Sequence, residues 1–306
     1  MAAKPGASTG GAGATFLPQP AASIVSIPTP DGTKIVAYEW GNAVGRPIVF
    51  VHGIYQSALT WTHQVSDPQL AGKYRLVAID LRGHGASDKP NGAEFYREGS
   101  RWADDIASLM ATLGLVKPVV VVWSYGGRVI NDYLLTNGDG RLGGLVYVGA
   151  RSTVRVGDQR HSEAVAEASR NLASDDPITM FKGTRQFVEV SFERPPSIAE
   201  VDALTLASMQ TPLYVRRHLV RRPLDYDEAL AAVRVPTLVV HGECDRVVPE
   251  AVGRQTHALI AHSEISLYPG VGHSPFAEDA GRFNAELHAF VSGLSEPKPV
   301  ESASPY

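Results

Sequence analysis

The chain has 306 residues, of which 44% are hydrophobic and 20% are charged, so it is long enough to bury a large core in one or two domains. Lys and Arg number 28 against 32 Asp and Glu, and the formal net charge of −4 argues against a nucleic-acid partner, which usually requires a basic surface. The single cysteine, Cys244, excludes an internal disulfide and a cysteine-based zinc site.

Both ends of the chain have the composition of disordered tails. Residues 1–23 are mostly Ala, Gly, Ser, Thr and Pro, and residues 296–306 contain three prolines. The first tail has no apolar stretch long enough for a secretory signal, and the longest uncharged apolar run, 119–123, is too short to cross a bilayer. We therefore expect a soluble protein without a membrane partner and, by default, a cytoplasmic location.

Segments typical of strands and helices alternate between the tails. The first two predicted strands, 24–27 and 35–40, flank Asp31-Gly32, a dipeptide typical of a hairpin turn. Short continuous apolar runs, typical of strands buried on both faces of a parallel sheet, follow at 48–51, 76–79, 119–123, 145–148, 238–240 and 265–268. Apolar residues at helical spacing predict helices at 101–113, 129–134 and 283–291. The alternation predicts an α/β sheet with right-handed crossovers.

Residues 151–230 interrupt this alternation. They have polar helical patterns and no convincing buried strand, and they lie between two predicted strands of the sheet. An insertion at the carboxyl edge of the sheet, where ligands bind in open α/β sheets, predicts a helical cap. The core then comprises 24–150 and 231–295. Four arginines of the cap are expected to form a solvated face: Arg216, Arg217, Arg221 and Arg222. The alternative is that one or two of them point inward and meet a carboxylate or carbonyl of the substrate.

The strongest chemical signal is a serine at a predicted strand-to-helix turn. Ser124 directly follows the strand at 119–123 and is followed by Tyr125, Gly126 and Gly127. A sharp turn of this kind, a nucleophile elbow, lifts the hydroxyl clear of the sheet, and the glycines let the helix pass close to the strand. The start of the helix also directs N–H groups toward developing negative charge. Ser124 is the predicted nucleophile.

A serine nucleophile needs a base to remove its proton and an acid to orient that base. His273 follows the last predicted strand, and Asp245 follows the strand at 238–240 by a short loop. The order Ser124, Asp245, His273 is the one expected when each residue ends its own strand of a parallel sheet. Glu243 is the rival carboxylate.

Backbone N–H groups are the predicted donors to the oxyanion of the intermediate. One belongs to Tyr125, and the other to Ile54 in the loop after 48–51. Tyr55 and Trp123 are candidate pocket residues, although packing in the loop and core accounts for them equally well. No pair of histidines has the spacing of a zinc protease, and no metal is predicted.

Other polar residues of these loops have structural interpretations. Arg82 and His84 are expected to hold the loop after 76–79. His52 and His241 each precede a glycine and are expected to anchor backbone groups by hydrogen bonds rather than to bind metal. Cys244, beside the proposed acid, is expected to be a small buried hydrophobe.

Together these motifs resemble the α/β-hydrolase superfamily over roughly residues 24–294. The motifs are Val51-His52-Gly53, Asp80-Leu81-Arg82-Gly83-His84-Gly85-Ala86-Ser87, the elbow at Ser124, His241-Gly242-Glu243-Cys244-Asp245 and Gly272-His273-Ser274-Pro275-Phe276. The resemblance implies an eight-stranded, mostly parallel sheet with the second strand antiparallel, a helical cap after the sixth strand, and an acyl-enzyme route without a cofactor. One position departs from the family pattern. Val122 replaces the glycine usual two residues before the serine, which predicts a slightly more open elbow and a less exact oxyanion hole.

Within the superfamily the chain looks like the small esterase, lactonase and cofactor-free haloperoxidase-like branch. The leading hypothesis is a serine hydrolase that cleaves a small or medium carboxylic ester or a lactone. The same triad would also serve a carbon–carbon bond hydrolase, a perhydrolase or an acyltransferase. Serine at position 124, where epoxide hydrolases and haloalkane dehalogenases of this fold have aspartate, argues against those two chemistries. The alternative from another class is a ligand-binding receptor that keeps the triad without sustained turnover. The oligomeric state is left open.

Overall fold

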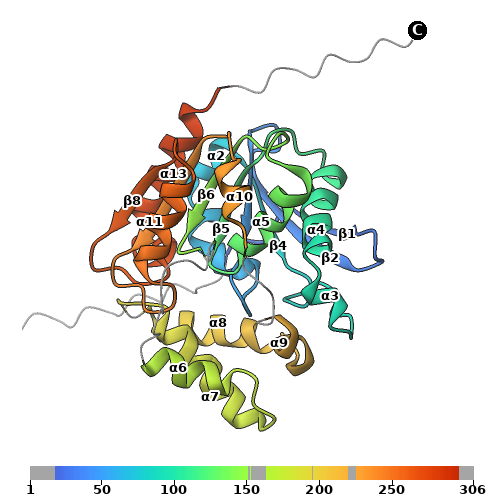
Figure 1. The fold of residues 1–306 in the computed structure, drawn as a ribbon, viewed down its shortest axis with the longest axis vertical. Coiled ribbons are helices and arrows are strands. Elements are labelled where there is room, and N and C mark those ends of the chain that lie inside the picture. The colour runs from blue at the N-terminus through green and yellow to red at the C-terminus, as the bar shows by residue number, and fades with distance from the viewer. Residues whose placement is uncertain (1–17, 151, 153–162, 195, 220–224, 296–306) are drawn as a thin grey trace, which may run out of the picture.

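In the computed structural model, which describes residues 18–150, 152, 163–194, 196–219 and 225–295, the chain folds around an eight-stranded sheet (Figure 1). The strands lie in the order β1-β2-β4-β3-β5-β6-β7-β8. Their bounds are β1 Ser23–Pro28, β2 Lys34–Gly41, β3 Pro47–Val51, β4 Arg75–Asp80, β5 Val119–Trp123, β6 Gly144–Val148, β7 Thr237–Gly242 and β8 Glu264–Tyr268. Each contains one of the predicted runs, so the predicted α/β-hydrolase sheet is confirmed.

The sheet is parallel except around its second strand. β2 pairs antiparallel with both β1 and β4, whereas all the other neighbours pair in parallel. The turn between β1 and β2 contains Gly32, whose φ of 83° suits glycine and is unfavourable for residues with a side chain. The hairpin predicted at Asp31-Gly32 is therefore present.

Helices cover both faces of the sheet. The helical segments are η1 Ala58–Trp61, α1 Thr62–Val65, α2 Pro68–Lys73, α3 Glu94–Arg97, α4 Gly99–Thr112, α5 Gly126–Asn137, α6 Glu163–Asn171, α7 Pro177–Val190, α8 Ile198–Met209, α9 Leu213–Leu219, α10 Asp227–Ala231, α11 Glu250–Leu259, α12 Pro275–Glu278 and α13 Ala280–Gly293. Three of them, α4, α5 and α13, correspond to the segments predicted to be helical, and α4 ends at Thr112, one residue before the predicted end.

Successive strand residues point to opposite faces, so a central strand contributes to two hydrophobic cores. Val120 and Val122 of β5 belong to the core that includes Trp102 of α4. Val121, between them, belongs to the core that includes Phe283 of α13. Burial on both faces explains why the central strands are continuous apolar runs rather than alternating ones.

Helices α6, α7, α8 and α9, which we call the inserted helices, follow β6 and lie together beyond one end of the sheet (Figure 1). That end is the carboxyl edge of the strands, since the loops there bond to the inserted helices. The His273 N–H after β8 donates to the carbonyl of Ser191 at 3.1 Å, and Gln56 Nε2 after β3 donates to Ser208 Oγ at 2.9 Å. The inserted helices thus stand over the edge to which the sequence analysis assigns the reactive residues.

Two of the predicted boundaries of the fold are wrong by a few residues. The N–H of Ala22 donates to the Glu39 carbonyl and β1 begins at Ser23, so the core starts before residue 24. α10, which begins at Asp227, contacts α5 and α11 of the core, so the core resumes before residue 231. The rest of the predicted tails, 1–17 and 296–306, lies outside the described residues. In the described ranges no helix is both long and apolar enough to span a membrane.

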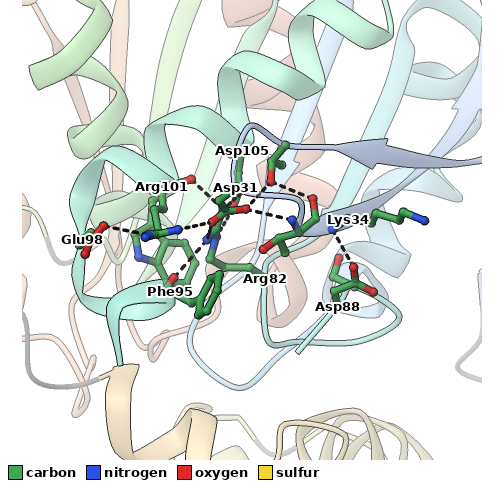
Figure 2. Close-up of polar contacts among 12 residues, drawn as sticks. Asp31, Lys34, Arg82, Asp88, Phe95, Glu98, Arg101 and Asp105 are labelled. Atoms are coloured by element: carbon green, nitrogen blue, oxygen red, sulfur yellow. Dashed lines mark hydrogen bonds and ion pairs between the residues drawn. The ribbon is translucent and has the colours of Figure 1, made fainter. Parts of the chain in front are cut away.

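A buried charge network ties the loop after β4 to its neighbours (Figure 2). Arg82 bonds both carboxylate oxygens of Asp105 at 2.6 and 2.7 Å, and its Nη1 donates to Asp31 at 2.7 Å. The side chains of Arg82 and Asp105 are completely buried. Nδ1 of His84 bonds the Arg82 carbonyl at 2.9 Å. The prediction that Arg82 and His84 hold this loop is confirmed.

Asp31 makes the stability of this network depend on pH. Burial alone would raise the pKa of its carboxyl, but hydrogen bonds from Arg82, Thr33 and Arg101 outweigh burial and hold the pKa far below the ordinary 3.8. Because the folded chain favours the ionised form of Asp31, this residue stabilises the fold at pH values above its pKa in the unfolded chain. The stabilisation is lost as the pH falls toward the lower pKa that Asp31 has in the folded chain.

We therefore expect Asp31→Asn to lower the free energy of unfolding at neutral pH by about 1.5–3 kcal/mol, the range of hydrogen bonds to charged groups. The difference from wild type should shrink as the pH drops below 3.8. Urea unfolding of both proteins over a pH series measures this difference in the free energy of unfolding. Asp202→Asn, which removes an exposed ion pair with Arg185, is the control and should cost less than about 1 kcal/mol. A pH-independent difference for Asp31→Asn would contradict the prediction.

Candidate active site

Ser124 occupies the turn between β5 and α5 in a strained conformation. Its φ of 51° is rare for a residue with a side chain. The turn is fixed by hydrogen bonds, because the Ser124 N–H donates to the Val148 carbonyl at 3.1 Å and the Gly127 N–H donates to the Ser124 carbonyl at 3.0 Å. The local geometry is that of the strand-to-helix elbow predicted from the sequence.

Two glycines make this turn possible. A Cβ on Gly126 would come within 2.8 Å of the Val51 carbonyl oxygen, and one on Gly53 would lie 2.8 Å from the Trp123 ring and 3.2 Å from Ser124 Cβ. Side chains at these positions would push the elbow away from the neighbouring loop. Val122, in place of the usual glycine, is fully buried in the sheet, and the turn at Ser124 keeps its positive φ.

His273 and Asp245 form a buried pair beyond the neighbouring strands β8 and β7. His273 Nδ1 lies 2.7 Å from Asp245 Oδ2, and the two side chains are 2% and 0% exposed. An ionised carboxylate only accepts hydrogen bonds, so the proton of this contact is on Nδ1. Nε2 of His273 then carries the lone pair that a general base requires.

The remaining contacts of Asp245 hold its carboxylate in place. Oδ1 accepts the N–H groups of Val247 and Val248, each at 2.8 Å. Burial would raise the pKa of Asp245, but the charge of His273 and the hydrogen bonds of His241 and His273 outweigh it and keep the pKa well below 3.8. Asp245 is therefore ionised across the range in which proteins are usually handled.

The rival carboxylate is placed differently. Glu243 is exposed, whereas Asp245 is buried against the imidazole. Cys244, expected to be buried, is half-buried. His241 lies inside the fold with Nε2 2.8 Å from the Val248 carbonyl, which confirms its predicted role of anchoring the backbone.

The loop after β3 is shaped by a buried histidine. The Leu81 N–H donates to His52 Nε2 at 3.0 Å, so the proton of His52 is on Nδ1, which bonds the Gly53 carbonyl at 2.7 Å. Burial lowers the pKa of His52, in accord with this neutral tautomer. His52 thus anchors the backbone, as predicted. The loop continues through Ile54 to Tyr55, which has a φ of 63°.

A small cavity brings Ser124 and His273 onto one wall. Its volume is about 20 Å³, and Trp123 and Phe276 contribute to its mostly apolar lining. A cavity needs about 10–15 Å³ to hold one water molecule, so this one admits a group the size of water or a methyl. Ile54 lines it as well.

A much larger cavity, of about 600 Å³, is also lined by Ser124. Tyr55, Tyr125 and Ile54 line it, and Phe187 of α7 lines both cavities. Burial raises the pKa of Tyr55 to about 12, so its hydroxyl is neutral at ordinary pH. The candidate pocket residues therefore both lie next to Ser124, Trp123 on the small cavity and Tyr55 on the large one.

Arg216 departs from the expected solvated face and follows the alternative, an arginine that points inward. Its side chain is completely buried, with the guanidinium 4.7 Å from the centre of the Tyr55 ring, and it lines the large cavity. Arg217 is exposed, as predicted, and pairs with Asp175 at 2.7 Å. Arg221 and Arg222 lie outside the described residues. Nothing in the residue pattern around 216 marked this arginine as buried.

Among the residues that the structure describes, no three His, Cys, Asp or Glu side chains are arranged to hold a metal ion. Ser124, Asp245 and His273 come, in that order, from the ends of β5, β7 and β8 of a mostly parallel sheet, which is the arrangement of α/β-hydrolase enzymes.

Comparison with known proteins leads to the same class. A family model described as "Alpha/beta hydrolase family" matches residues 48–286, and the chain belongs to this family. Non-heme chloroperoxidase CPO-A1 of Kitasatospora aureofaciens is 31% identical over 277 residues, which cover 86% of this chain and 98% of the relative. Bifunctional esterase/perhydrolase DCH of Acinetobacter calcoaceticus is 27% identical over 279 residues, covering 87% and 98%.

Solved structures agree. Esterase RhEst1 from Rhodococcus sp. ECU1013 superposes with a TM-score of 0.82 at 37% identity, over 89% of this chain and 100% of that one. Esterase EaEST from Exiguobacterium antarcticum gives a TM-score of 0.75 at 26% identity, over 88% and 99%. The chain is therefore an enzyme of the α/β-hydrolase superfamily, with relatives named as esterases and non-heme haloperoxidases.

Proposed function

We propose that the protein is a serine hydrolase that cleaves a carboxylic ester through Ser124, His273 and Asp245. The observation that carries the proposal is the buried 2.7 Å contact between His273 and Asp245, with the imidazole on the same cavity wall as the strained Ser124. The esterase names of several relatives support the choice of ester bonds over other acyl substrates.

In the first half of the reaction, Ser124 Oγ attacks the ester carbonyl carbon while His273 Nε2 takes the hydroxyl proton. The carbonyl oxygen, which becomes negatively charged, accepts hydrogen bonds from the N–H groups of Ile54 and Tyr125. The intermediate collapses when the bond to the leaving oxygen breaks, and His273 gives its proton to that oxygen. The alcohol departs, and the acyl group remains on Ser124.

In the second half, a water molecule replaces the alcohol. His273 removes a proton from it, its oxygen attacks the acyl carbon, and the bond to Ser124 Oγ breaks as the serine recovers its proton. Asp245 keeps the proton of the imidazole on Nδ1 and stabilises the imidazolium in both halves. The products are the carboxylic acid and the free enzyme.

A perhydrolase activity is a second candidate. One relative is named as a bifunctional esterase/perhydrolase, and others as non-heme haloperoxidases. The small cavity beside Ser124 and His273 has room for a molecule little larger than water. Hydrogen peroxide in that place would attack the acyl-enzyme and release a peracid instead of the acid.

The test is steady-state release of p-nitrophenol from acetate, butyrate and octanoate esters, followed by labelling with a fluorophosphonate and mass spectrometry of the peptide that holds Ser124. We expect sustained turnover, and its loss in step with labelling of Ser124. A single stoichiometric burst would favour a receptor that only binds, and label on another residue would overturn the assignment. Peracid formation from acetate and hydrogen peroxide tests the second candidate.

A further inference from the structure

Two cavities of unequal size are lined by Ser124. The small one has a volume of about 20 Å³, and the large one has a volume of about 600 Å³. An ester has two groups, one on each side of the reacting carbonyl. The two cavities therefore fit an ester with one group of about methyl size and one longer group.

The large cavity concentrates positive charge, although the chain as a whole has a formal net charge of −4. Four arginines line it, together with His218: Arg97, Arg128, Arg216 and Arg217. None of the described residues of its wall is Asp or Glu. A group that enters the cavity is therefore exposed to a positive potential in surroundings partly shielded from water.

Arg216 is the most deeply buried of these arginines. Its hydrogen-bond acceptors are neutral: the carbonyls of Thr211, Leu172 and Ser208 and the hydroxyl of Thr184, at 2.6–3.0 Å, and Met209 Sδ at 3.9 Å. In the described part of the chain no carboxylate pairs with it. A buried charge is ordinarily paired with an opposite one. A negative group in the adjacent cavity would supply that partner.

Arg97 of α3 and Arg217 of α9 are exposed, and these two helices contact each other (Figure 1). Arg97 Nη2 lies 3.4 Å from His218 Nδ1, which joins the two helices, and both residues line the cavity. Arg217, from α9, pairs with Asp175, but that carboxylate is 83% exposed, so the pair contributes little and is easily rearranged. The donors at this end are accessible to an incoming anion.

These charges are within reach of the reacting carbon. Tyr125, directly after Ser124, spans the gap to α9, because its hydroxyl donates to the Leu219 carbonyl at 3.2 Å. The end of α9 is thus one tyrosine side chain away from the elbow. A chain of a few methylene groups that starts at the ester carbonyl covers that length.

We propose that the natural substrate is an anionic ester, with a methyl-sized group on one side of the carbonyl and, on the other, a short chain that ends in a carboxylate bound among Arg97, Arg216 and Arg217. The proposal rests on the serine-hydrolase function proposed above. Two kinds of substrate fit this description. One is a half ester of a dicarboxylic acid with methanol, and the other is an acetate ester of an ω-hydroxy acid.

The experiment compares two matched pairs of substrates by pH-stat. In the first arm, monomethyl adipate is compared with dimethyl adipate. In the second, 6-acetoxyhexanoate is compared with its methyl ester. We expect kcat/KM for the anion to exceed that for its neutral partner by roughly 10- to 100-fold in one arm, the range for one charge-assisted hydrogen bond. The arm that shows the preference identifies which side of the ester carries the carboxylate.

Variants of the cavity arginines test whether these side chains cause the preference for the anionic ester. Arg216→Met and the double variant Arg97→Gln/Arg217→Gln should each bring the ratio of anionic to neutral kcat/KM toward one. The double variant changes exposed side chains, so it keeps the test valid if Arg216→Met fails to fold. Arg254→Gln, which removes an exposed arginine outside the cavity, is the control and should keep the wild-type ratio.

The outcomes separate this proposal from the one on which it rests. Turnover of neutral esters without a preference for the anion in either arm overturns the anionic substrate and leaves the serine hydrolase standing. A preference that the double variant and Arg216→Met both retain also overturns it. No turnover of any ester, together with none of p-nitrophenyl esters, overturns the hydrolase itself.

Discussion

Replacing Ser124 by alanine should lower kcat for ester hydrolysis by about 10⁴- to 10⁶-fold, since the covalent route is lost and only the oxyanion donors and binding remain. The fold should survive. Position 124 has a positive φ in either protein, so serine and alanine bear a similar backbone strain. Steady-state rates with p-nitrophenyl acetate and thermal unfolding of both proteins measure the two effects.

Ser274→Ala is the matched control for this variant. Ser274 is also buried and lines the small cavity beside His273, and its hydroxyl has no hydrogen-bond partner among the described residues. We expect its removal to change kcat by less than about tenfold, because no proton transfer passes through it. A Ser124→Ala protein that keeps its activity, or a Ser274→Ala protein that loses it, would contradict Ser124 as the nucleophile.

The sheet was predictable because its strands are buried on both faces. A continuous apolar run as short as the one in β5 is typical of a central strand of a parallel sheet, and the helical patterns between such runs indicate the crossovers. Helix α11 was not predicted. Of its buried residues Val252, Gly253 and Thr256, only Val252 has a hydrophobic side chain, and packing against β7 and β8 stabilises the helix.

The pairing of His273 with Asp245 could be anticipated from topology. Both follow strands, and β7 and β8 are neighbours in the sheet, so loops at their carboxyl ends lie side by side. The choice between Asp245 and Glu243 depended on the chain order and loop length. The physical difference is that Asp245 is buried and accepts the N–H groups of Val247 and Val248, whereas Glu243 is exposed.

The buried environment of Arg216 could not be predicted from the sequence. Its acceptors come from several places in the inserted segment, including Leu172 after α6 and Ser208 of α8. Which carbonyls remain unpaired at helix ends, and which of them converge, depends on how the helices pack. A run of arginines is usually a solvated face, and only the packed helices distinguish the buried member from its exposed neighbour Arg217.

Asp245→Asn should lower kcat by about 10⁴-fold while KM changes little. The reason lies in the two oxygens of the carboxylate. Oδ1 accepts the N–H groups of Val247 and Val248, so the amide oxygen of an asparagine stays there. The NH₂ group then takes the position of Oδ2, 2.7 Å from His273 Nδ1. A donor at that place requires Nδ1 to accept, which moves the imidazole proton to Nε2 and leaves no lone pair toward Ser124.

Glu243→Gln provides the comparison, because it makes the same chemical change on an exposed neighbour two positions away. Its kcat should remain within a few-fold of wild type. Folding is monitored by thermal unfolding of both variants, since the amide in the Asp245 variant also faces His241 Nε2, 3.2 Å from Oδ2 in the native protein. A large loss of kcat in Glu243→Gln with little in Asp245→Asn would mean that the orienting acid is Glu243, reached by a rearranged loop. Loss in Asp245→Asn through KM alone would assign that carboxylate to substrate binding, because a tautomer change acts on the chemical step and not on affinity.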